Sequence, residues 1–334
     1  MDKIAIIGLG LTGNSIGMAL KKGKAGSVRV AGFDPDSTLE QYALRRHMSV
    51  DEIAPNLEGA VKGASLVILS TPPSAGGEVL EAIAPFLEDG TTVTDTFALK
   101  EPIMSDARKL LGNSISFVGG HPFSLTVDLD AAGENIAPSA DIFAGAPWCI
   151  MPLPGARNDA LNTVINLAEL LGGKPLFIDP VEHDSFLAAV SHLPVVTSTA
   201  FLKAVTDSPA WSDMSGLAHG RFRSVSDAVG ADAETLAAML VDNSRSLVRW
   251  VDQYISALYD LRSMLAAEDE EGLKQVLGEM YAARLEWVTP DGASEGDAKL
   301  RADLRQAITD ARPSQALMGS YLTEKIFRRR ERGG

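Results

Sequence analysis

Two patterns of apolar and polar positions divide the chain near residue 179. In the first part, short apolar runs rich in β-branched residues alternate with amphipathic stretches, and such runs predict strands. The predicted strands are 3–8, 27–34, 65–71, 91–96, 114–120, 146–152 and 174–179. The helical patterns between them include 12–23, 76–87, 100–111 and 157–171. Strands that alternate with helices predict a parallel sheet covered on both faces, which is a doubly wound α/β fold.

After Pro180 the pattern changes to long amphipathic stretches that predict helices. These stretches are 181–206, 233–265, 268–287 and 297–310, with a terminal one near 314–330. Turn-rich breaks separate them at 207–213 and 289–297. We therefore predict an α/β domain over residues 1–179 and an α-helical domain over residues 180–334. The predicted helices carry several long apolar stripes, and one small face of the α/β domain cannot bury them all. We therefore expect the helical domain to form a homodimer.

Composition narrows the choice of partners and of compartment. At 334 residues, of which 46% are hydrophobic, the chain suits two packed domains. The net charge of −14 disfavours nucleic acid or an anionic membrane as a partner, but not a small anionic ligand. The single Cys149 excludes a disulfide framework within one chain, fits a reducing compartment and is expected in the core. With neither a signal-peptide pattern nor an apolar stretch of bilayer-spanning length, we expect a soluble cytoplasmic protein.

The segment GLGLTG (8–13) matches the pattern G-x-G-x-x-G directly after a predicted strand and at the start of a predicted helix. In dinucleotide-binding folds the first glycine, here Gly8, permits the tight turn. Gly10 would let the backbone approach a pyrophosphate, and Gly13 would let the helix pack closely on the strand. The amide groups at the helix start would then hold the negative charge.

Asp34 stands at the end of the second predicted strand, at the distance from the glycines that this pattern requires. A carboxylate there accepts hydrogen bonds from ribose hydroxyls and repels a 2′-phosphate, so it favours NAD over NADP. The alternative is that the glycines only make a turn and that Asp34 caps the next helix. The strand, the glycines, the helix and the acid together predict a dinucleotide-binding Rossmann domain over residues 1–179.

Three further predicted strands end in short polar loops, STPPS (70–74), DTFALK (95–100) and HPF (121–123). Because doubly wound sheets bind ligands at the carboxyl ends of their strands, we expect these loops to face one crevice. The residues expected to bind the cofactor are Gly8, Gly10, Leu11, Thr12, Gly13, Asp34, Ser70, Thr71, Pro72 and Thr96.

His121 is the candidate proton acceptor, because it stands where the nicotinamide half of the cofactor is expected. Nicotinamide accepts the hydride, and the protein must supply a group that accepts the proton. Imidazole, with an ordinary pKa of about 6.5, can take a hydroxyl proton at neutral pH. The alternative is a loop histidine that is bonded to the backbone.

The other histidines have weaker claims. His192 is a second catalytic candidate, because Pro194 is expected to kink its helix and expose polar backbone to a ligand. The alternative for His192 is a satisfied histidine at the kink. His183 lies nine positions earlier, on nearly the opposite helix face, and is expected at the domain hinge. His47 and His219 do not belong to any motif of candidate catalytic residues. No spacing typical of metal ligands occurs in the sequence, so we predict no metal site.

In this order, these residues resemble the prephenate/arogenate dehydrogenase family of tyrosine biosynthesis. The resemblance rests on GLGLTGNSIGMAL, VILSTPPS, TDTFALK and FVGGHPF, and continues through EHDSFLAAVSHLP and GRFRSVSDAV. It implies that the histidine matching His121 accepts the proton of the ring hydroxyl, that hydride passes to NAD(P), and that loss of the ring carboxylate aromatises the product. It also implies that the helical domain forms the dimer and closes the cleft.

The chain departs from the family pattern at three positions that bear on the substrate. Ala98 stands where the family carries a serine, and Val195 where it usually carries a second histidine. Aligning FRSVSD with the family pattern FRD-x-T-R puts Asp227 at the arginine that binds the side-chain carboxylate of prephenate. Two desolvated carboxylates repel each other. The residues expected to bind a small-molecule carboxylate substrate are Lys100, Ser191, Arg221 and Arg223.

We therefore predict an NAD-dependent dehydrogenase of the prephenate/arogenate type, which acts on a cyclic hydroxy acid with His121 as the general base. Two alternatives stay open. One is a dehydrogenase of the same fold for a different cyclic alcohol or hydroxy acid. The other is a non-catalytic NAD-sensing protein whose helical half binds a partner.

Overall fold

The computed structural model describes residues 3–288 except 24–27, 45–48, 127–128, 130–135 and 230–232. The chain divides into two compact units, residues 1–251 and residues 252–334. The helices predicted at 297–310 and 314–330, the break predicted at 289–297, and His47 all lie outside the described residues. The domain boundary predicted at residue 180 falls inside the first unit and stays a prediction.

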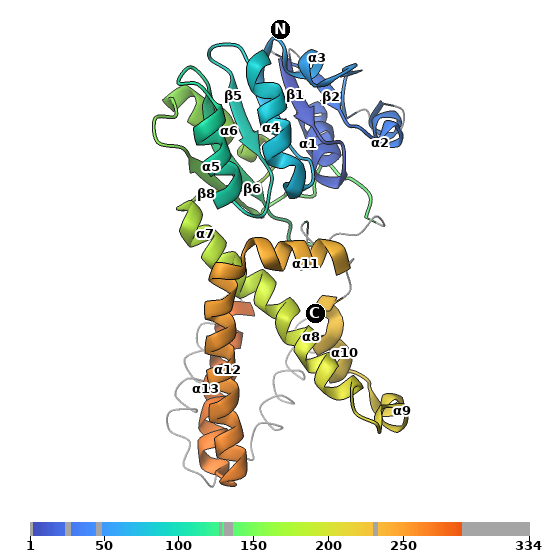
Figure 1. The fold of residues 1–334 in the computed structure, drawn as a ribbon, viewed down its shortest axis with the longest axis vertical. Coiled ribbons are helices and arrows are strands. Elements are labelled where there is room, and N and C mark those ends of the chain that lie inside the picture. The colour runs from blue at the N-terminus through green and yellow to red at the C-terminus, as the bar shows by residue number, and fades with distance from the viewer. Residues whose placement is uncertain are drawn as a thin grey trace, which may run out of the picture. The chain divides into compact units, whose positions relative to one another are not determined.

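An eight-stranded sheet forms the centre of the first unit, with the strand order β3-β2-β1-β4-β5-β6-β7-β8 (Figure 1). The strands are β1 Lys3–Ile7, β2 Arg29–Phe33, β3 Glu52–Ile53, β4 Ala64–Leu69, β5 Thr92–Asp95, β6 Ser116–Pro122, β7 Pro147–Pro152 and β8 Lys174–Phe177. All seven predicted strands are present, and the additional β3 is too short to show a periodic pattern. Because β1, β2, β4, β5 and β6 run parallel, the segments after them meet at one edge of the sheet.

One strand pair departs from the predicted parallel sheet. β7 runs antiparallel to β6, with His121 opposite Cys149. The described part of the connection between these strands, residues 123–126, 129 and 136–146, holds no helix. Parallel neighbours need a long crossover, usually a helix, whereas antiparallel neighbours do not. The α/β fold is confirmed with this correction.

Helices cover both faces of the sheet, as the alternating pattern predicted (Figure 1). They are α1 Leu11–Lys22, α2 Ser37–Tyr42, α3 Leu57–Val61, α4 Gly76–Ile83, α5 Glu101–Leu110 and α6 Asn158–Leu170. Ile6 belongs to the apolar core formed with α1 and α6, and Ile7 to the core formed with α3, α4 and α5, because successive strand side chains point to opposite faces. Cys149 is buried in the second core, as predicted, and burial raises the pKa of its thiol to about 11.

From residue 180 to residue 288 the described residues form helices and turns without a strand, which confirms the predicted helical half. The helices are α7 Pro180–Leu187, α8 Leu193–Thr206, α9 Trp211–Met214, α10 Arg221–Ser226, α11 Ala233–Asp242, α12 Ser244–Ala266 and α13 Glu270–Val288. The single helix predicted over 233–265 is divided at Asn243, whose buried side chain donates to the main-chain oxygen of Asp184 at 2.7 Å. A side-chain amide bonded outside its own helix favours such a break.

A π-helical turn, Ala188–His192, joins α7 to α8. Pro194 lies directly after this π turn, in the first turn of α8, and has no N–H to donate to the preceding turn of the continuous helical run. A π turn adds about one residue to the helix and so rotates later side chains by roughly 100°. The prediction that His183 and His192 face nearly opposite directions assumed an unbroken α-helix, and the π turn removes its basis. Both side chains are buried.

Among the described residues, the continuous helical run Pro180–Thr206 is long and apolar enough to cross a membrane, with a mean hydropathy of 1.5. This corrects the expectation that no stretch approaches that length. A single helix of this kind is weak support for a membrane span, because core helices of globular proteins have the same length and composition. This run also carries four buried polar residues, His183, Asp184, His192 and Ser198.

Candidate functional site

The loop between β1 and α1 has the form that the glycine pattern predicted. Gly8 has a φ of 96°, and a side chain on it would collide with the main-chain oxygen of Ser70. A side chain on Gly13 would collide with the oxygen of Gly8, so α1 lies directly against the strand end. Gly10, in contrast, has nothing within 4 Å of the position that its side chain would take. The loop is therefore packed at Gly8 and Gly13 and open at Gly10.

The start of α1 presents main-chain amide groups at this open position. Gly10 is the N-cap and provides no side-chain hydrogen bond. The first helical hydrogen bond runs from the Asn14 amide to the Gly10 oxygen at 3.0 Å. The amides of Leu11, Thr12 and Gly13 therefore have no acceptor within the helix. A helix start of this kind binds phosphate groups, because these amides and the helix dipole both favour negative charge.

Asp34, directly after β2, is held against the glycine loop. Its carboxylate accepts from the Leu9 amide at 2.7 Å and from the Asp36 amide at 2.9 Å. The N-cap of α2 is Asp36, which accepts from the Thr38 amide at 2.7 Å, so the alternative that Asp34 caps this helix is wrong. Each oxygen of Asp34 can accept a further hydrogen bond. Its predicted contact with ribose hydroxyls is therefore chemically possible at this position and stays a prediction.

The segments after β4 and β5 lie beside the glycine loop. The Ser70 amide donates to the Ile7 oxygen at 2.7 Å, and the Thr96 hydroxyl lies 3.2 Å from the Ser70 hydroxyl. The hydroxyl oxygen of Thr71 is buried and has no hydrogen-bond partner among the described residues. Pro72 is exposed next to it. The structure thus brings Gly8, Ser70, Thr71 and Thr96 together, as the order of strand ends predicted.

His121 belongs to β6 and is not a loop residue, and only 1% of its surface is exposed. Its Nδ1 lies 3.0 Å from Nε2 of His183. Nδ1 of His183 in turn lies 2.9 Å from Oδ1 of Asp184. Burial lowers the pKa of the His183 imidazole, although the hydrogen bond to Asp184 acts in the opposite direction. These three side chains form a continuous hydrogen-bonded chain from β6 to α7.

The carboxylate of Asp184 is fixed by main-chain amides at the start of α5. The Lys100 amide lies 3.0 Å from its Oδ1 and 3.1 Å from its Oδ2, and the Glu101 amide donates to Oδ2 at 2.9 Å. Asp184 therefore satisfies amides of α5 that have no acceptor within that helix. The same carboxylate holds a helix start with one set of bonds and His183 with another.

A buried ion pair lies beside this carboxylate. The ammonium group of Lys100 pairs with Asp95 and donates to the Gly120 oxygen at 2.6 Å, and both charged side chains are 0% exposed. Asp95 also accepts from the amides of Gly120 and Phe97, each at 3.1 Å. These contacts fix the residue that precedes His121. We predicted Lys100 as a substrate ligand, but the contacts that the structure gives it are those of a structural ion pair.

The remaining predicted site residues lie on the helices after β8. His192 is fully buried, and its Nδ1 lies 3.3 Å from the side-chain nitrogen of Asn243, which also bonds the main chain of Asp184. Ser191 is half-buried in the π turn. Arg221 and Arg223 are exposed on α10. The catalytic role of His192 and the substrate contacts of the other three stay predictions.

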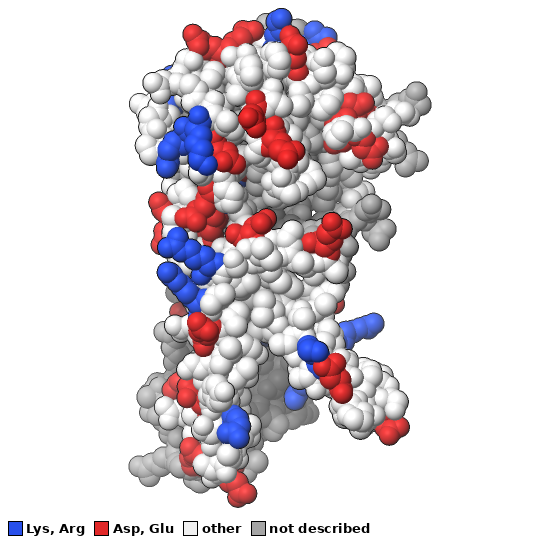
Figure 2. Space-filling view, in the orientation of Figure 1, with Lys and Arg blue, Asp and Glu red and all other residues white. Residues whose placement is uncertain are grey.

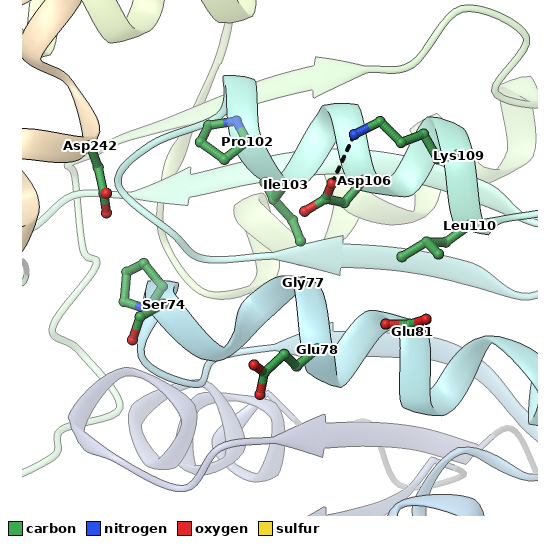
Figure 3. Close-up of a pocket in the computed structure, with 11 residues that line it drawn as sticks. Ser74, Gly77, Glu78, Glu81, Pro102, Ile103, Asp106, Lys109, Leu110 and Asp242 are labelled. Atoms are coloured by element: carbon green, nitrogen blue, oxygen red, sulfur yellow. Dashed lines mark hydrogen bonds and ion pairs between the residues drawn. The ribbon is translucent and has the colours of Figure 1, made fainter.

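A cavity of about 500 Å³ lies between α4 and α5, and none of the predicted site residues lines it. Figure 3 shows the residues that line this cavity. Its lining includes the acidic residues Glu78, Glu81, Asp106 and Asp242, and Lys109 donates to Asp106 at 3.3 Å. Figure 2 shows acidic side chains over α4 and basic ones over α5 on this side of the molecule.

No cluster of three His, Cys, Asp or Glu side chains in the described part of the chain could hold a metal ion.

Sequence reasoning missed the roles of His183, Asp184 and Asp95. Their signals are present as an adjacent histidine and aspartate in EHDS and as an acid and a lysine within DTFALK. Neither signal identifies its partners, because the contact from His121 to His183 spans 62 residues and that from Lys100 to Asp184 spans 84.

Two family models match the chain. The model described as the nucleotide-binding domain of prephenate dehydrogenase matches residues 16–176, and the one described as its dimerization domain matches residues 179–279. Cyclohexadienyl dehydrogenase of Zymomonas mobilis is 28% identical over 287 residues, which cover 84% of this chain and 94% of that protein. Prephenate dehydrogenase of Bacillus subtilis is 26% identical over 81% of this chain and 72% of that protein.

Solved structures show the same likeness. Arogenate dehydrogenase of Synechocystis superposes with a TM-score of 0.75 at 28% identity, covering 86% of this chain and 100% of that one. Prephenate dehydrogenase of Aquifex aeolicus, solved with hydroxyphenyl propionate and NAD+, has a TM-score of 0.76 at 23% identity, covering 86% of this chain and 98% of that one. The second comparison, at this level of identity, shows a common fold.

Proposed function

The chain belongs to the prephenate dehydrogenase family and is a dehydrogenase, and we propose that it oxidises a cyclic hydroxy acid with NAD as the hydride acceptor. The proposed substrates are prephenate and arogenate, the compounds that its relatives are named for. The observation that carries this proposal is the hydrogen-bonded chain that ends at His121, on the strand next to those that hold the predicted cofactor loops.

Three features of the first unit support NAD binding. The loop is open at Gly10, and the start of α1 offers amides for a pyrophosphate there. The buried hydroxyl of Thr71 has no hydrogen-bond partner among the described residues, and a bound ligand would satisfy it. Asp34 would accept from ribose hydroxyls and repel a 2′-phosphate, which favours NAD over NADP. Bound NAD supplies the hydride acceptor, and the chain binds and orients it.

His121 is the proposed general base. It would take the proton of the substrate hydroxyl as the hydride leaves the same carbon, because the product would otherwise be a protonated carbonyl. Its Nδ1 faces His183, so the proton would be accepted at Nε2. Burial of His121 keeps bulk water from competing for this nitrogen.

The substrate side of the proposed site differs from the family pattern. Asp227 is exposed at the end of α10 where that pattern has an arginine, and Arg221 and Arg223 are the cations on the same helix. A carboxylate at this position favours a second candidate function, the oxidation of a different cyclic alcohol or hydroxy acid. The third reading, a non-catalytic NAD sensor, gives no reason for a buried chain of two histidines and an aspartate.

The proposed assembly is a homodimer formed through the helices after residue 180. The match to a dimerization domain supports it. So does the number of large apolar side chains that are exposed on α12 and α13, because an assembly would remove their surface from water. These include Tyr259, Leu265, Leu277, Met280 and Trp287. A cytoplasmic location remains a prediction from composition.

The test measures NADH formation by the purified protein with prephenate and with arogenate. We expect turnover of at least one, and we expect His121→Asn to lower it by on the order of 100- to 10,000-fold without a change in NAD affinity. His219→Asn, which alters an exposed histidine, is the matched control and should keep full activity. Stabilisation by NAD alone with no turnover of any cyclic hydroxy acid or alcohol would support the sensor, and turnover of another cyclic alcohol the second candidate.

A further inference from the structure

With Asp184 ionised and His183 neutral, the chain from Asp184 through His183 to His121 has one arrangement of its protons. An ionised carboxylate can only accept, so Nδ1 of His183 must carry a hydrogen to bond Oδ1 of Asp184 at 2.9 Å. The other nitrogen of a neutral His183, Nε2, is then an acceptor. Nδ1 of His121, 3.0 Å away, must be the donor to it. The remaining nitrogen of His121, Nε2, is left with its lone pair.

We infer that His183 and Asp184 are positioning residues that hold His121 in the tautomer with its hydrogen on Nδ1. In this tautomer Nε2 can accept the hydroxyl proton of the substrate, whereas in the other tautomer it already carries a hydrogen. The inference deepens the proposed function and rests on it for the role of Nε2, while the tautomer itself can be observed without any substrate.

The contacts of Asp184 explain how one carboxylate can fix the tautomers of both His183 and His121. Its two oxygens accept from the amides of Lys100 and Glu101 at 2.9–3.1 Å, so the carboxylate cannot rotate away from His183. Its main-chain oxygen is held by Asn243 at 2.7 Å. A group that orients a histidine base must itself be oriented by its surroundings. The start of α5 and the side chain of Asn243 provide that orientation.

The charges around His183 favour its neutral form. Asp184 on its own helix favours the imidazolium, whereas His121 on β6 and the Lys100 ammonium at the start of α5 disfavour it. Burial is the largest effect, and the pKa of His183 lies below its ordinary value. A doubly protonated His183 would donate from both nitrogens and force His121 into the wrong tautomer. When His121 takes the substrate proton at Nε2, its Nδ1–H bond persists and Asp184 compensates the new positive charge through His183.

The first experiment observes the tautomers in the absence of substrate. The chain has five histidines, so ¹⁵N-histidine labelling with single replacements assigns the ring nitrogens by NMR. We expect His121 protonated at Nδ1 and unprotonated at Nε2 in the unmodified protein at neutral pH. In Asp184→Asn, an amide nitrogen that faces His183 would reverse both hydrogen bonds and move the His121 hydrogen to Nε2. A His121 that already carries its hydrogen on Nε2 in the unmodified protein overturns the inference.

The second experiment measures turnover of the substrate that the unmodified enzyme accepts. Replacing the carboxylate of a Ser-His-Asp triad by an amide lowers turnover about 10⁴-fold, because the wrong tautomer is fixed. We expect Asp184→Asn and His183→Leu to lower kcat by on the order of 10²- to 10⁴-fold with NAD affinity unchanged. His183→Gln should lower kcat by no more than about tenfold, because its amide oxygen can accept from His121. Glu182→Gln, an exposed neighbour on α7, is the control.

Two further results separate positioning from a structural role. The acid limb of the pH profile of kcat/KM in the unmodified enzyme should contain the protonation of His183, whose pKa lies below its ordinary value. This contribution should be absent in His183→Gln. The loss of the α5 cap can prevent Asp184→Asn from folding. In that case the comparison of kcat between His183→Leu and His183→Gln still tests whether His183 acts by accepting a hydrogen bond from His121. Equal turnover by His183→Leu and the unmodified enzyme overturns the inference. A protein with the Nδ1–H tautomer that oxidises neither prephenate nor arogenate contradicts the proposed function and still supports the tautomer assignment.

Discussion

Replacement of Lys100 by methionine distinguishes a substrate ligand from a buried ion-pair partner. Methionine keeps most of the length and the apolar stem of lysine but removes the charge. The side chains of Lys100 and Asp95 are both 0% exposed, so the variant leaves a carboxylate buried without its cation. Asp95 would keep two donors, the amides of Gly120 and Phe97 at 3.1 Å.

The size of the effect follows from these contacts. Removing one partner of a buried ion pair costs about 3–5 kcal/mol, because the remaining charge is uncompensated. The two amides that still bond Asp95 put the expected cost near the lower end, about 3 kcal/mol. In a domain of about 150–250 residues each kcal/mol lowers Tm by about 2–4 °C, so Lys100→Met should lower Tm by roughly 6–12 °C.

Thermal unfolding followed by circular dichroism, together with steady-state kinetics, decides between the roles. Lys109→Met is the matched control, because that side chain is 68% exposed and its one ion pair among the described residues is with Asp106 on the surface. Its Tm should change by no more than about 2–4 °C. The double variant Asp95→Asn with Lys100→Met should regain part of the loss, because no uncompensated charge remains. An unchanged Tm with a raised KM in Lys100→Met would refute the ion-pair reasoning and restore Lys100 as a substrate ligand.

Four more outcomes are expected. Asp34→Ala should weaken NAD binding and narrow the preference over NADP, measured by fluorescence titration; equal affinities in the unmodified protein would contradict the ribose assignment. Native Cys149, with a pKa of about 11, should resist alkylation at pH 8 until the protein is unfolded, and rapid labelling of folded protein would contradict its burial. Asp227→Arg should raise kcat/KM for prephenate by roughly tenfold or more, unless the unmodified enzyme is already efficient. The pKa of His183 in the folded protein lies below its unfolded value of about 6.5, so the unfolded chain binds more protons below that pH. The free energy of unfolding should therefore fall as the pH drops below about 6.5. Denaturation at several pH values should show the same fall in His219→Asn and a smaller fall in His183→Gln.

The cofactor half of the site was readable from the sequence because it is local. The glycine loop occupies six consecutive positions, and parallel strand order alone brings Ser70 and Thr96 to it. The chain from His121 to Asp184 was not readable, because it depends on how α7 returns to the end of β6 across 62 residues. A helical wheel also misplaces His183 relative to His192, since the π turn between them cannot be deduced from a 3.6-residue period.

The alanine at position 98 makes the tautomer of His121 more important for the proposed reaction. Ala98, Leu99 and Leu187 form a small buried apolar cluster with Phe123 packed against it. The ring of Phe123 lies 4.3 Å from that of His121, measured between centroids. A serine at position 98, as in the family pattern, would add a hydroxyl to this cluster. That hydroxyl would help to orient the substrate hydroxyl even beside a poorly placed base. The side chains of Ala98, Leu99 and Leu187 can neither donate nor accept a hydrogen bond. In the proposed reaction the direction of the proton transfer therefore rests on Nε2 of His121, and through it on His183 and Asp184.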